Sequence, residues 1–147
     1  MLESLVYGQP GHLIRRAHQA AWAAFMEETK GQEITPVQYA ALIAIADNPG
    51  IDATRLSQLI AFDRATIGNV LDRLEKKGLL TRVKSPSDKR AKLTFLTAGG
   101  KRTIKVISES VTNIAERIFG GLSMRERRTL MSLLSKLVDI EHAGRSD

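Results

Sequence analysis

Residues 35–97 contain three closely spaced helix signals followed by a β-hairpin signal, and this order restricts the possible folds more than any other feature. Thr35-Pro36-Val37-Gln38 is a capping box with proline at the first helical position, which predicts a helix start. Asp52 is a typical N-cap residue before the second segment, and Gly78 ends the third. The predicted helices cover residues 36–47, 53–60 and 64–77.

A hairpin is predicted directly after the third helix. Residues 79–84 and 91–96 have strand character, and Ser85-Pro86-Ser87-Asp88 between them has the residue types of a turn. Polar and apolar residues alternate in the second strand, which predicts a half-buried strand with Leu93 and Phe95 on its apolar side. Three helices followed by a two-stranded wing form the winged helix-turn-helix arrangement.

Further helices are predicted on both sides of this segment, at residues 12–30, 97–119 and 123–140. The predicted fold class is mainly α with a small β-hairpin, in a single domain over residues 1–147. Residues 35–100 would form a winged helix-turn-helix DNA-binding lobe. Its recognition helix is expected at about 64–77 and its wing at about 80–96. The N- and C-terminal helices, residues 1–34 and 101–147, would form a helical dimerisation lobe.

The positive charge is concentrated in the middle of the chain. Residues 51–105 hold 13 Lys/Arg and 5 Asp/Glu, a balance of +8, whereas the remainder holds 9 and 11, a balance of −2, which gives the total of +6. Such an asymmetry favours a polyanionic partner, with DNA or RNA ahead of a membrane surface. A basic face that is merely solvated is the alternative.

The third helix has the pattern of a helix that enters the major groove of DNA. Its apolar face repeats at i, i+3, i+4 and i+7, and small or polar residues occupy the other side. An amphipathic helix with a solvated face would look similar, but a glycine exposed in mid-helix suggests close approach to a partner. The residues expected to contact bases or phosphates are Arg64, Thr66, Gly68, Asn69 and Arg73.

The hairpin has a cationic tip that could follow the DNA backbone beside the recognition helix. Lys84, Lys89, Arg90 and Lys92 are the expected contacts, with Arg90 a candidate for a narrow minor groove. Asp88 is interpreted as a brace that orients Arg90 or an adjacent backbone amide. A hairpin that is charged only for solubility is the alternative.

Two motifs give the chain a resemblance to the multiple antibiotic resistance regulator (MarR) family. Asp88-Lys89-Arg90-Ala91, followed by Leu96-Thr97 and Gly100, resembles the wing signature of that family, and residues 71–79 resemble the end of its recognition helix. The resemblance implies a homodimer that binds a pseudo-palindromic double-stranded operator, with a ligand pocket between the DNA-binding and dimerisation parts. It also implies that the groove-facing positions are Arg64, Thr66, Gly68 and Asn69, that Arg73 contacts the DNA backbone and that Arg90 lies at the wing tip.

A dimer is also indicated by the C-terminal apolar pattern. Ile104, Ile107, Val111, Ile114 and Ile118 are spaced by three and four residues, as in a coiled-coil seam. A second apolar stripe lies at residues 130–138. Packing of these residues within one chain is the alternative.

Candidate effector-binding residues lie in the first predicted helix: His12, Arg15, Arg16, His18 and Trp22. Aromatic and cationic groups together suit an aromatic carboxylate or a phosphate-bearing thioester. The stretch resembles the first helix of MarR-family regulators of aromatic-acid catabolism, some of which respond to aromatic acyl-coenzyme A thioesters. Surface ion pairing of the arginines and a structural role for His18 are the alternatives.

Catalysis is not expected, because the histidines lack metal-ligand spacing and no serine has a recognisable histidine and acid arrangement. The sequence predicts no metal site, no cofactor, no membrane partner and a cytoplasmic location, since cysteine is absent and no secretory signal is evident. The predicted function is a homodimeric, DNA-binding transcriptional repressor released by a small aromatic effector. A winged-helix protein-interaction module or an architectural DNA-binding module without an effector is the alternative.

Overall fold

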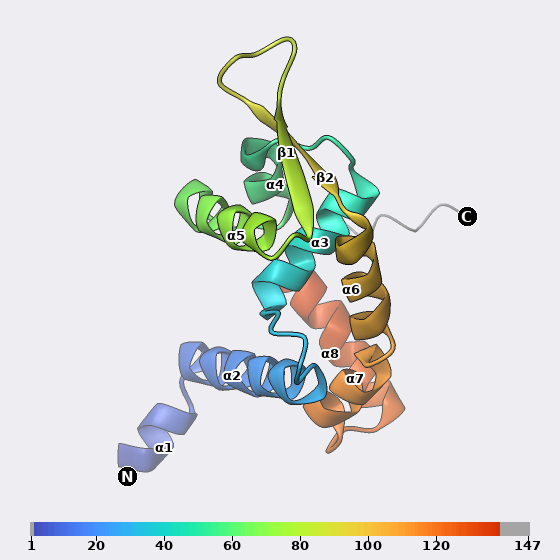
Figure 1. Ribbon diagram of the computed structural model, residues 1–147. Helices are drawn as coiled ribbons and strands as arrows, with labels where there is room; N and C mark the ends of the chain where they lie inside the picture. The colour runs from blue at the N-terminus through green and yellow to red at the C-terminus, as the bar shows by residue number, and fades with distance from the viewer. Residues whose placement is uncertain (1, 139–147) are drawn as a thin grey trace, which may run out of the picture.

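The computed structural model describes residues 2–138, with side chains from residue 5 onward. The described chain forms helices and one two-stranded antiparallel sheet, arranged as a winged lobe above a layer of terminal helices (Figure 1). The elements are α1 (Leu2–Tyr7), α2 (Pro10–Glu28), α3 (Pro36–Asp47), α4 (Ala53–Leu59), α5 (Arg64–Lys76), β1 (Leu80–Lys84), β2 (Lys92–Leu96), α6 (Ala98–Ser108), α7 (Val111–Phe119) and α8 (Met124–Leu137).

Side-chain caps fix the starts of the three helices in the winged lobe. At α3 the Gln38 amide donates to the Thr35 hydroxyl, and the Gln38 side chain accepts from the Thr35 amide, which completes the predicted capping box. Asp52 caps α4 and Asp63 caps α5 through backbone amides three residues later. The predicted winged helix-turn-helix order is therefore confirmed, with boundaries that agree within one residue for α3, α4 and α5.

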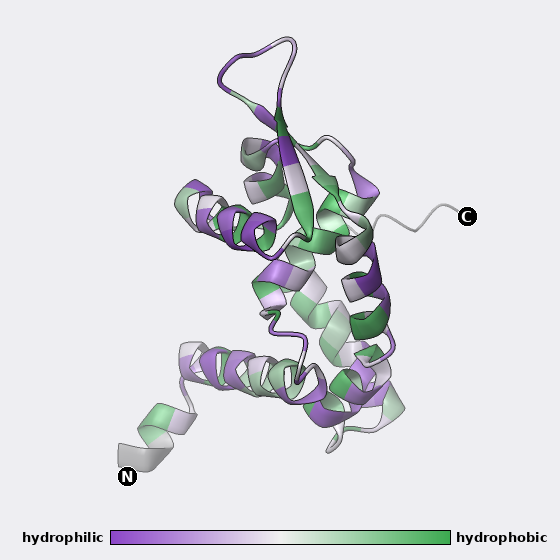
Figure 2. Ribbon diagram, in the orientation of Figure 1, coloured by the Kyte–Doolittle hydropathy of each residue, from purple (hydrophilic) through white to green (hydrophobic). Residues whose placement is uncertain are grey.

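The core of the winged lobe lies where α3, α4, α5 and β1 meet. The predicted buried face of α5 packs into it, because Ile67, Val70, Leu71 and Leu74 are all buried. Leu42, Ile45, Leu56 and Leu80 complete the centre of this cluster. Figure 2 shows hydrophilic residues on the wing loop and along α5, on the outside of this core.

The hairpin has a regular register, but its buried side differs from the prediction. Arg82 pairs with Thr94, and Thr81 pairs with Phe95. Thr94 is buried and Phe95 is exposed, so the prediction that Leu93 and Phe95 mark the buried side is wrong. The reason is that Thr94 shares a face of the hairpin with Leu80 and Leu96, which pack into and against the core of the lobe. In the plane of the sheet, the Thr94 amide donates to the Ile51 carbonyl oxygen, and the Gly50 amide donates to the Thr94 carbonyl oxygen.

The terminal helices depart from the sequence prediction at three places. The helix α1 was not predicted, and α2 begins at Pro10 rather than His12, because proline fits the first helical turn. The single helix expected over residues 97–119 is divided into α6 and α7. At the break, the Ser110 amide donates to the carbonyl oxygen of Ile107, three residues earlier, which is a tighter turn than that of an α-helix. The Ser110 hydroxyl donates to the Glu28 carbonyl oxygen on α2. The predicted end of α8 near residue 140 lies outside the described residues.

The apolar seam predicted for a dimer packs mostly within the chain. Ile107 is part of the core, and Ile104 and Ile114 pack against it. The intramolecular alternative therefore holds for these three residues. The second stripe, on α8, remains exposed at Leu133, Leu134 and Leu137, and neither α7 nor α8 has a fully buried side chain. None of the described helices is both long and apolar enough to span a bilayer.

Candidate nucleic-acid interface

The helix α5 presents its polar side outward from the winged lobe. Arg64, Asn69 and Arg73 are exposed, as expected for contacts with a partner. Thr66 is less available, because its hydroxyl donates to Asp63 Oδ2 at 2.5 Å and its amide donates to Asp63 Oδ1 at 2.8 Å. These hydrogen bonds, the side-chain one foremost, lower the pKa of Asp63. The cap therefore stays charged and holds the first turn of α5.

Gly68 has no intramolecular reason to lack a side chain. A Cβ built there would lie 3.8 Å from Nη1 of Arg64, which is an ordinary contact distance. Alanine would therefore fit within this chain. The glycine thus stays consistent with close approach of a partner to α5.

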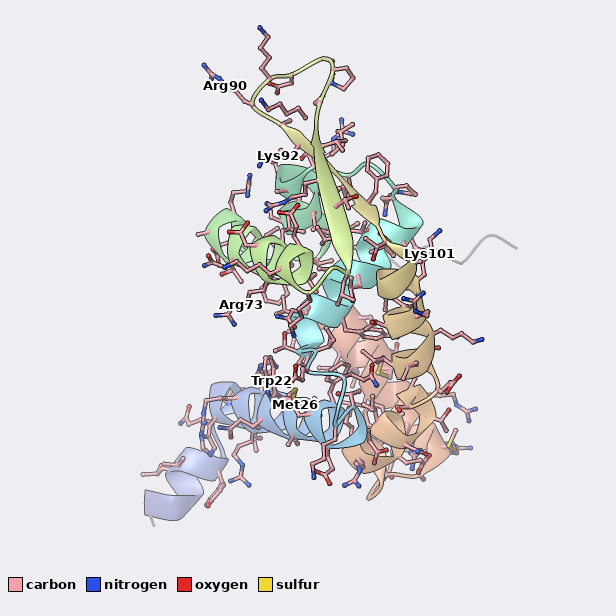
Figure 3. The ribbon with its side chains drawn as sticks, in the orientation of Figure 1. Trp22, Met26, Arg73, Arg90, Lys92 and Lys101 are labelled. Carbon is pink, nitrogen blue, oxygen red and sulfur yellow. The ribbon has the colours of Figure 1, made fainter. Side chains whose placement is uncertain are left out.

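The predicted cationic wing residues surround the hairpin tip. Lys84 and Lys92 face each other across the two strands, and both are exposed together with Lys89 and Arg90. Figure 3 shows Arg90 and Lys92 at the projecting end of the molecule. Asp88 Oδ1 accepts the backbone amide of Arg90 at 2.9 Å, so the brace acts on the backbone.

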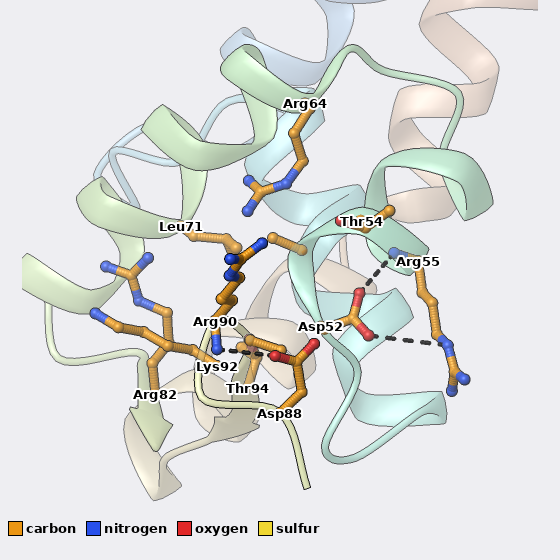
Figure 4. A pocket seen from close by; sticks show the side chains of 12 residues that line it. Asp52, Thr54, Arg55, Arg64, Leu71, Arg82, Asp88, Arg90, Lys92 and Thr94 are labelled. Carbon is orange, nitrogen blue, oxygen red and sulfur yellow. Dashed lines mark hydrogen bonds and ion pairs between the residues drawn. The ribbon is translucent and has the colours of Figure 1, made fainter. Parts of the chain in front are cut away.

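A hollow of about 560 Å³ lies between α4, α5 and the hairpin (Figure 4). Two acids, Asp52 and Asp88, line it, and each already accepts a backbone amide. The cations that line it come from all three elements: Arg55, Arg64, Arg82, Arg90 and Lys92. Arg55 and Arg82 already pair with carboxylates, so the cations best placed to meet a phosphate group in this concave surface are Arg64, Arg90 and Lys92.

Arg55 and Arg82 line this hollow but were not among the predicted site residues. Arg82 holds two carboxylates of α5: its Nη2 donates to Asp72 Oδ1 at 2.6 Å and to Glu75 Oε1 at 2.9 Å, and its Nε donates to Glu75 Oε2 at 3.3 Å. The hydrogen bond from Arg82 lowers the pKa of Glu75. A sequence signal for Arg82 was present, because it shares one face of the strand with Lys84.

The candidate effector residues are not brought together. A second hollow, of about 280 Å³, is lined by Trp22 of α2, by Thr35, Val37 and Gln38 at the start of α3, and by Thr66, Asn69, Val70 and Arg73 of α5. Figure 3 shows Trp22 and Arg73 on the two sides of this region.

The other four candidates line neither of these two hollows. His12 lies 3.4 Å, Nδ1 to Nη2, from Arg15, and the His18 ring is 6.2 Å from that of Trp22. Arg16 is exposed on the same helix.

The three-helix lobe, its outward helix and its cationic hairpin define a winged-helix DNA-binding protein. Comparison with known proteins gives the family. The profile described as "MarR family" matches residues 34–92, and the chain is 31% identical over 137 residues to the HTH-type transcriptional repressor NicR of Pseudomonas putida, covering 92% of this chain and 87% of NicR. The chain belongs to the MarR family and is a DNA-binding transcription regulator.

Two solved structures of similar proteins extend this comparison. The transcriptional repressor CouR, bound to a 23-mer DNA duplex, superposes with a TM-score of 0.85 at 27% identity, covering 94% of this chain and 97% of CouR. BpsR of Bordetella bronchiseptica, whose DNA binding is regulated by 6-hydroxynicotinic acid, superposes with a TM-score of 0.83 at 31% identity, covering 91% of this chain and 96% of BpsR. These likenesses confirm the predicted family and fold class.

Proposed function

We propose that this protein is a homodimeric repressor that binds a pseudo-palindromic operator and leaves it when a small aromatic acid binds. The cationic hollow between α4, α5 and the hairpin carries the proposal, because it joins the recognition helix and the wing in one phosphate-binding surface. Arg64, Gly68 and Asn69 would face the major groove, Arg73 would contact the DNA backbone, and the wing cations would follow the adjacent backbone. Such a regulator would act in the cytoplasm.

Exposed apolar side chains on the terminal helices support the homodimer. Leu5, Leu13 and Ile14 on α1 and α2, and Leu133 and Leu137 on α8, are all exposed in the single chain. Contact with a second copy would bury them, and a two-fold symmetric dimer would present two recognition helices to two half-sites.

The hollow between α2, α3 and α5 supports a small aromatic acid as the effector. Trp22, Val37 and Val70 offer apolar contacts, Gln38 offers a polar group, and Arg73 offers a cation for a carboxylate. Its volume of about 280 Å³ favours a single-ring acid over a whole coenzyme A thioester. The regulation of BpsR by an aromatic carboxylic acid, 6-hydroxynicotinic acid, agrees with this chemistry.

Selection of genomic fragments by the protein, followed by footprinting, tests the DNA part of the proposal. We expect protected sites with two-fold symmetry, and we expect Arg90→Ala to weaken binding to all of them. Lys101→Ala, on α6 and outside both hollows, is the control that should bind as the wild type does. Binding without sequence preference would indicate an architectural protein, and no binding at low salt would indicate a protein-interaction module.

Thermal-shift screening of aromatic acids and their coenzyme A thioesters tests the effector part, since a ligand that binds the native state raises the melting temperature. A ligand that raises it should also release the protected sites. Trp22→Ala should remove the ligand-induced rise in melting temperature and leave DNA binding intact. Arg16→Ala should retain both the rise in melting temperature and DNA binding. Loss of the shift in Arg16→Ala with an unchanged response in Trp22→Ala would contradict the assigned hollow.

A further inference from the structure

Two carboxylates lie on the side of α5 that is proposed to face DNA. Asp72 follows Gly68 by four residues and Glu75 follows Asp72 by three, so the three residues share one side of the helix. Their side chains are 58% and 41% exposed. Unpaired, they would repel the phosphate backbone that the neighbouring cations attract.

The hairpin supplies the compensating charge. Arg82 projects from β1 onto α5, where its guanidinium bonds both carboxylates through Nη2 and Nε. Its side chain is only 16% exposed, because it lies between the hairpin and the helix. An arginine already bound to two carboxylates in this way is poorly placed to bind a phosphate of its own.

We propose that Arg82 is a positioning residue that neutralises Asp72 and Glu75, so that the DNA-facing side of α5 does not repel the backbone. The inference rests on the proposed contact of α5 and the wing with DNA. It assigns to Arg82 a role different from that of the exposed wing cations, which would contact the duplex directly.

Charge counting separates this role from direct phosphate binding. Arg82, Asp72 and Glu75 together carry one positive and two negative charges, a balance of −1 in the wild type. Arg82→Met changes it to −2, D72N/E75Q changes it to +1, and the triple variant changes it to 0. If Arg82 only neutralises the acids, the triple variant should bind DNA as well as the wild type. If Arg82 binds phosphate, the triple variant should stay weak.

The test measures binding of the full-length protein to a labelled duplex pool of random sequence, at about 50 mM and about 200 mM salt. We expect Arg82→Met to bind about tenfold more weakly at low salt, and the triple variant to bind within about threefold of the wild type or more tightly. D72N/E75Q should bind at least as tightly as the wild type. A triple variant as weak as Arg82→Met would overturn the inference.

Two further variants keep the test independent of folding. Arg82→Lys retains the charge without the three hydrogen bonds, and it should bind nearly as the wild type does. Arg127→Met is the matched control, because Arg127 is also 16% exposed and holds a carboxylate, Glu116, between α7 and α8. Equal losses in Arg82→Met and Arg127→Met would indicate general destabilisation and overturn the inference. No DNA binding by the wild type would overturn the proposed function as well.

Discussion

At the scale of single residues, α5 has a well-capped start at Asp63 but also a glycine, Gly68, that lowers the stability of the helix. Asp63 holds the first turn through the amide and hydroxyl of Thr66. Gly68, one turn further on, has room for a methyl group within the chain. Since glycine in a helix destabilises by about 0.5–1 kcal/mol relative to alanine, its presence is better explained by a partner than by the fold.

Gly68→Ala should therefore change stability and DNA binding in opposite directions. We expect the free energy of unfolding in denaturant to rise by about 0.5–1 kcal/mol, since alanine is the better helix former. We expect DNA affinity to fall by about tenfold, because the methyl group would meet the duplex. Gly11→Ala in α2, which also has open space around it, should leave DNA affinity unchanged. Unchanged DNA affinity in Gly68→Ala would argue against close approach at this position.

The Asp63 cap makes a pH-dependent contribution whose sign follows from its lowered pKa. A carboxyl with a lowered folded-state pKa stabilises the fold above its unfolded pKa of about 4, and this stabilisation is lost as the pH falls through the folded value. The melting temperature of the wild type should therefore fall more steeply than that of Asp63→Asn between about pH 5 and about pH 2. Parallel curves for the two proteins would show that the charge of Asp63 contributes nothing.

At the scale of elements, the hairpin is fixed to the rest of the lobe by a close backbone contact at the start of α6. Thr97 caps α6 and its hydroxyl also donates to the Gly78 carbonyl oxygen at 2.6 Å. Gly100 lies against Leu79, the residue before β1. A Cβ built on Gly100 would be 2.1 Å from the Leu79 carbonyl oxygen. The two nearest atoms both belong to the Leu79 backbone, which cannot move aside as a flexible side chain could.

Two neighbouring glycines of α6 should thus respond differently to alanine. Gly100→Ala should destabilise the protein by about 1–3 kcal/mol, since the added methyl overlaps backbone atoms. Gly99→Ala should cost little, because its Cβ would meet nothing closer than 3.4 Å. Denaturant unfolding of both variants checks this contrast, and equal effects would contradict the packing described for α6.

The elements also show what the sequence could and could not predict. Local signals located α3, α4 and α5, because the caps at Thr35 and Asp52 act within one turn of a helix start and Gly78 follows the end of α5. The cap at Asp63 was not predicted. The break between α6 and α7 was missed, because the apolar spacing continues through it. It depends on Ser110 bonding the carbonyl oxygen of Glu28 on α2, a contact far away in the sequence.

The site was predictable to a similar extent. The exposed cations of α5 and the hairpin follow from helix and strand periodicity. The bonding of Arg82 to Asp72 and Glu75 does not, because it depends on how the hairpin packs against α5. The grouping of Trp22 with Arg73, rather than with His12 or Arg15, likewise depends on how α2 packs beneath the winged lobe.

At the scale of the whole molecule, the two lobes expose different groups of side chains that serve different proposed contacts. The winged lobe exposes cations around its hollow, whereas the terminal helices expose leucines on α1, α2 and α8. Association through the leucines would leave the cations of both copies free for one duplex. Dimer formation and operator binding should therefore depend on each other.

Leu133→Asp on α8 tests this dependence. We expect a monomer by light scattering and a large loss of operator affinity, because one copy retains only one half-site contact. Leu59→Asp is the matched control, since Leu59 is 56% exposed on α4 and Leu133 is 58% exposed. Leu59→Asp should remain dimeric. A dimeric Leu133→Asp protein would place the association surface elsewhere.

The order of elements along the chain has a consequence for synthesis. The helix α2 packs against α7, yet the entire winged lobe separates them in the sequence (Figure 1). A ribosome therefore completes the winged lobe while α2, although it also contacts α3, still lacks α7, its main packing partner. The surface proposed for association is assembled last, so nascent copies gain the ability to pair only after the part that reads DNA has been made.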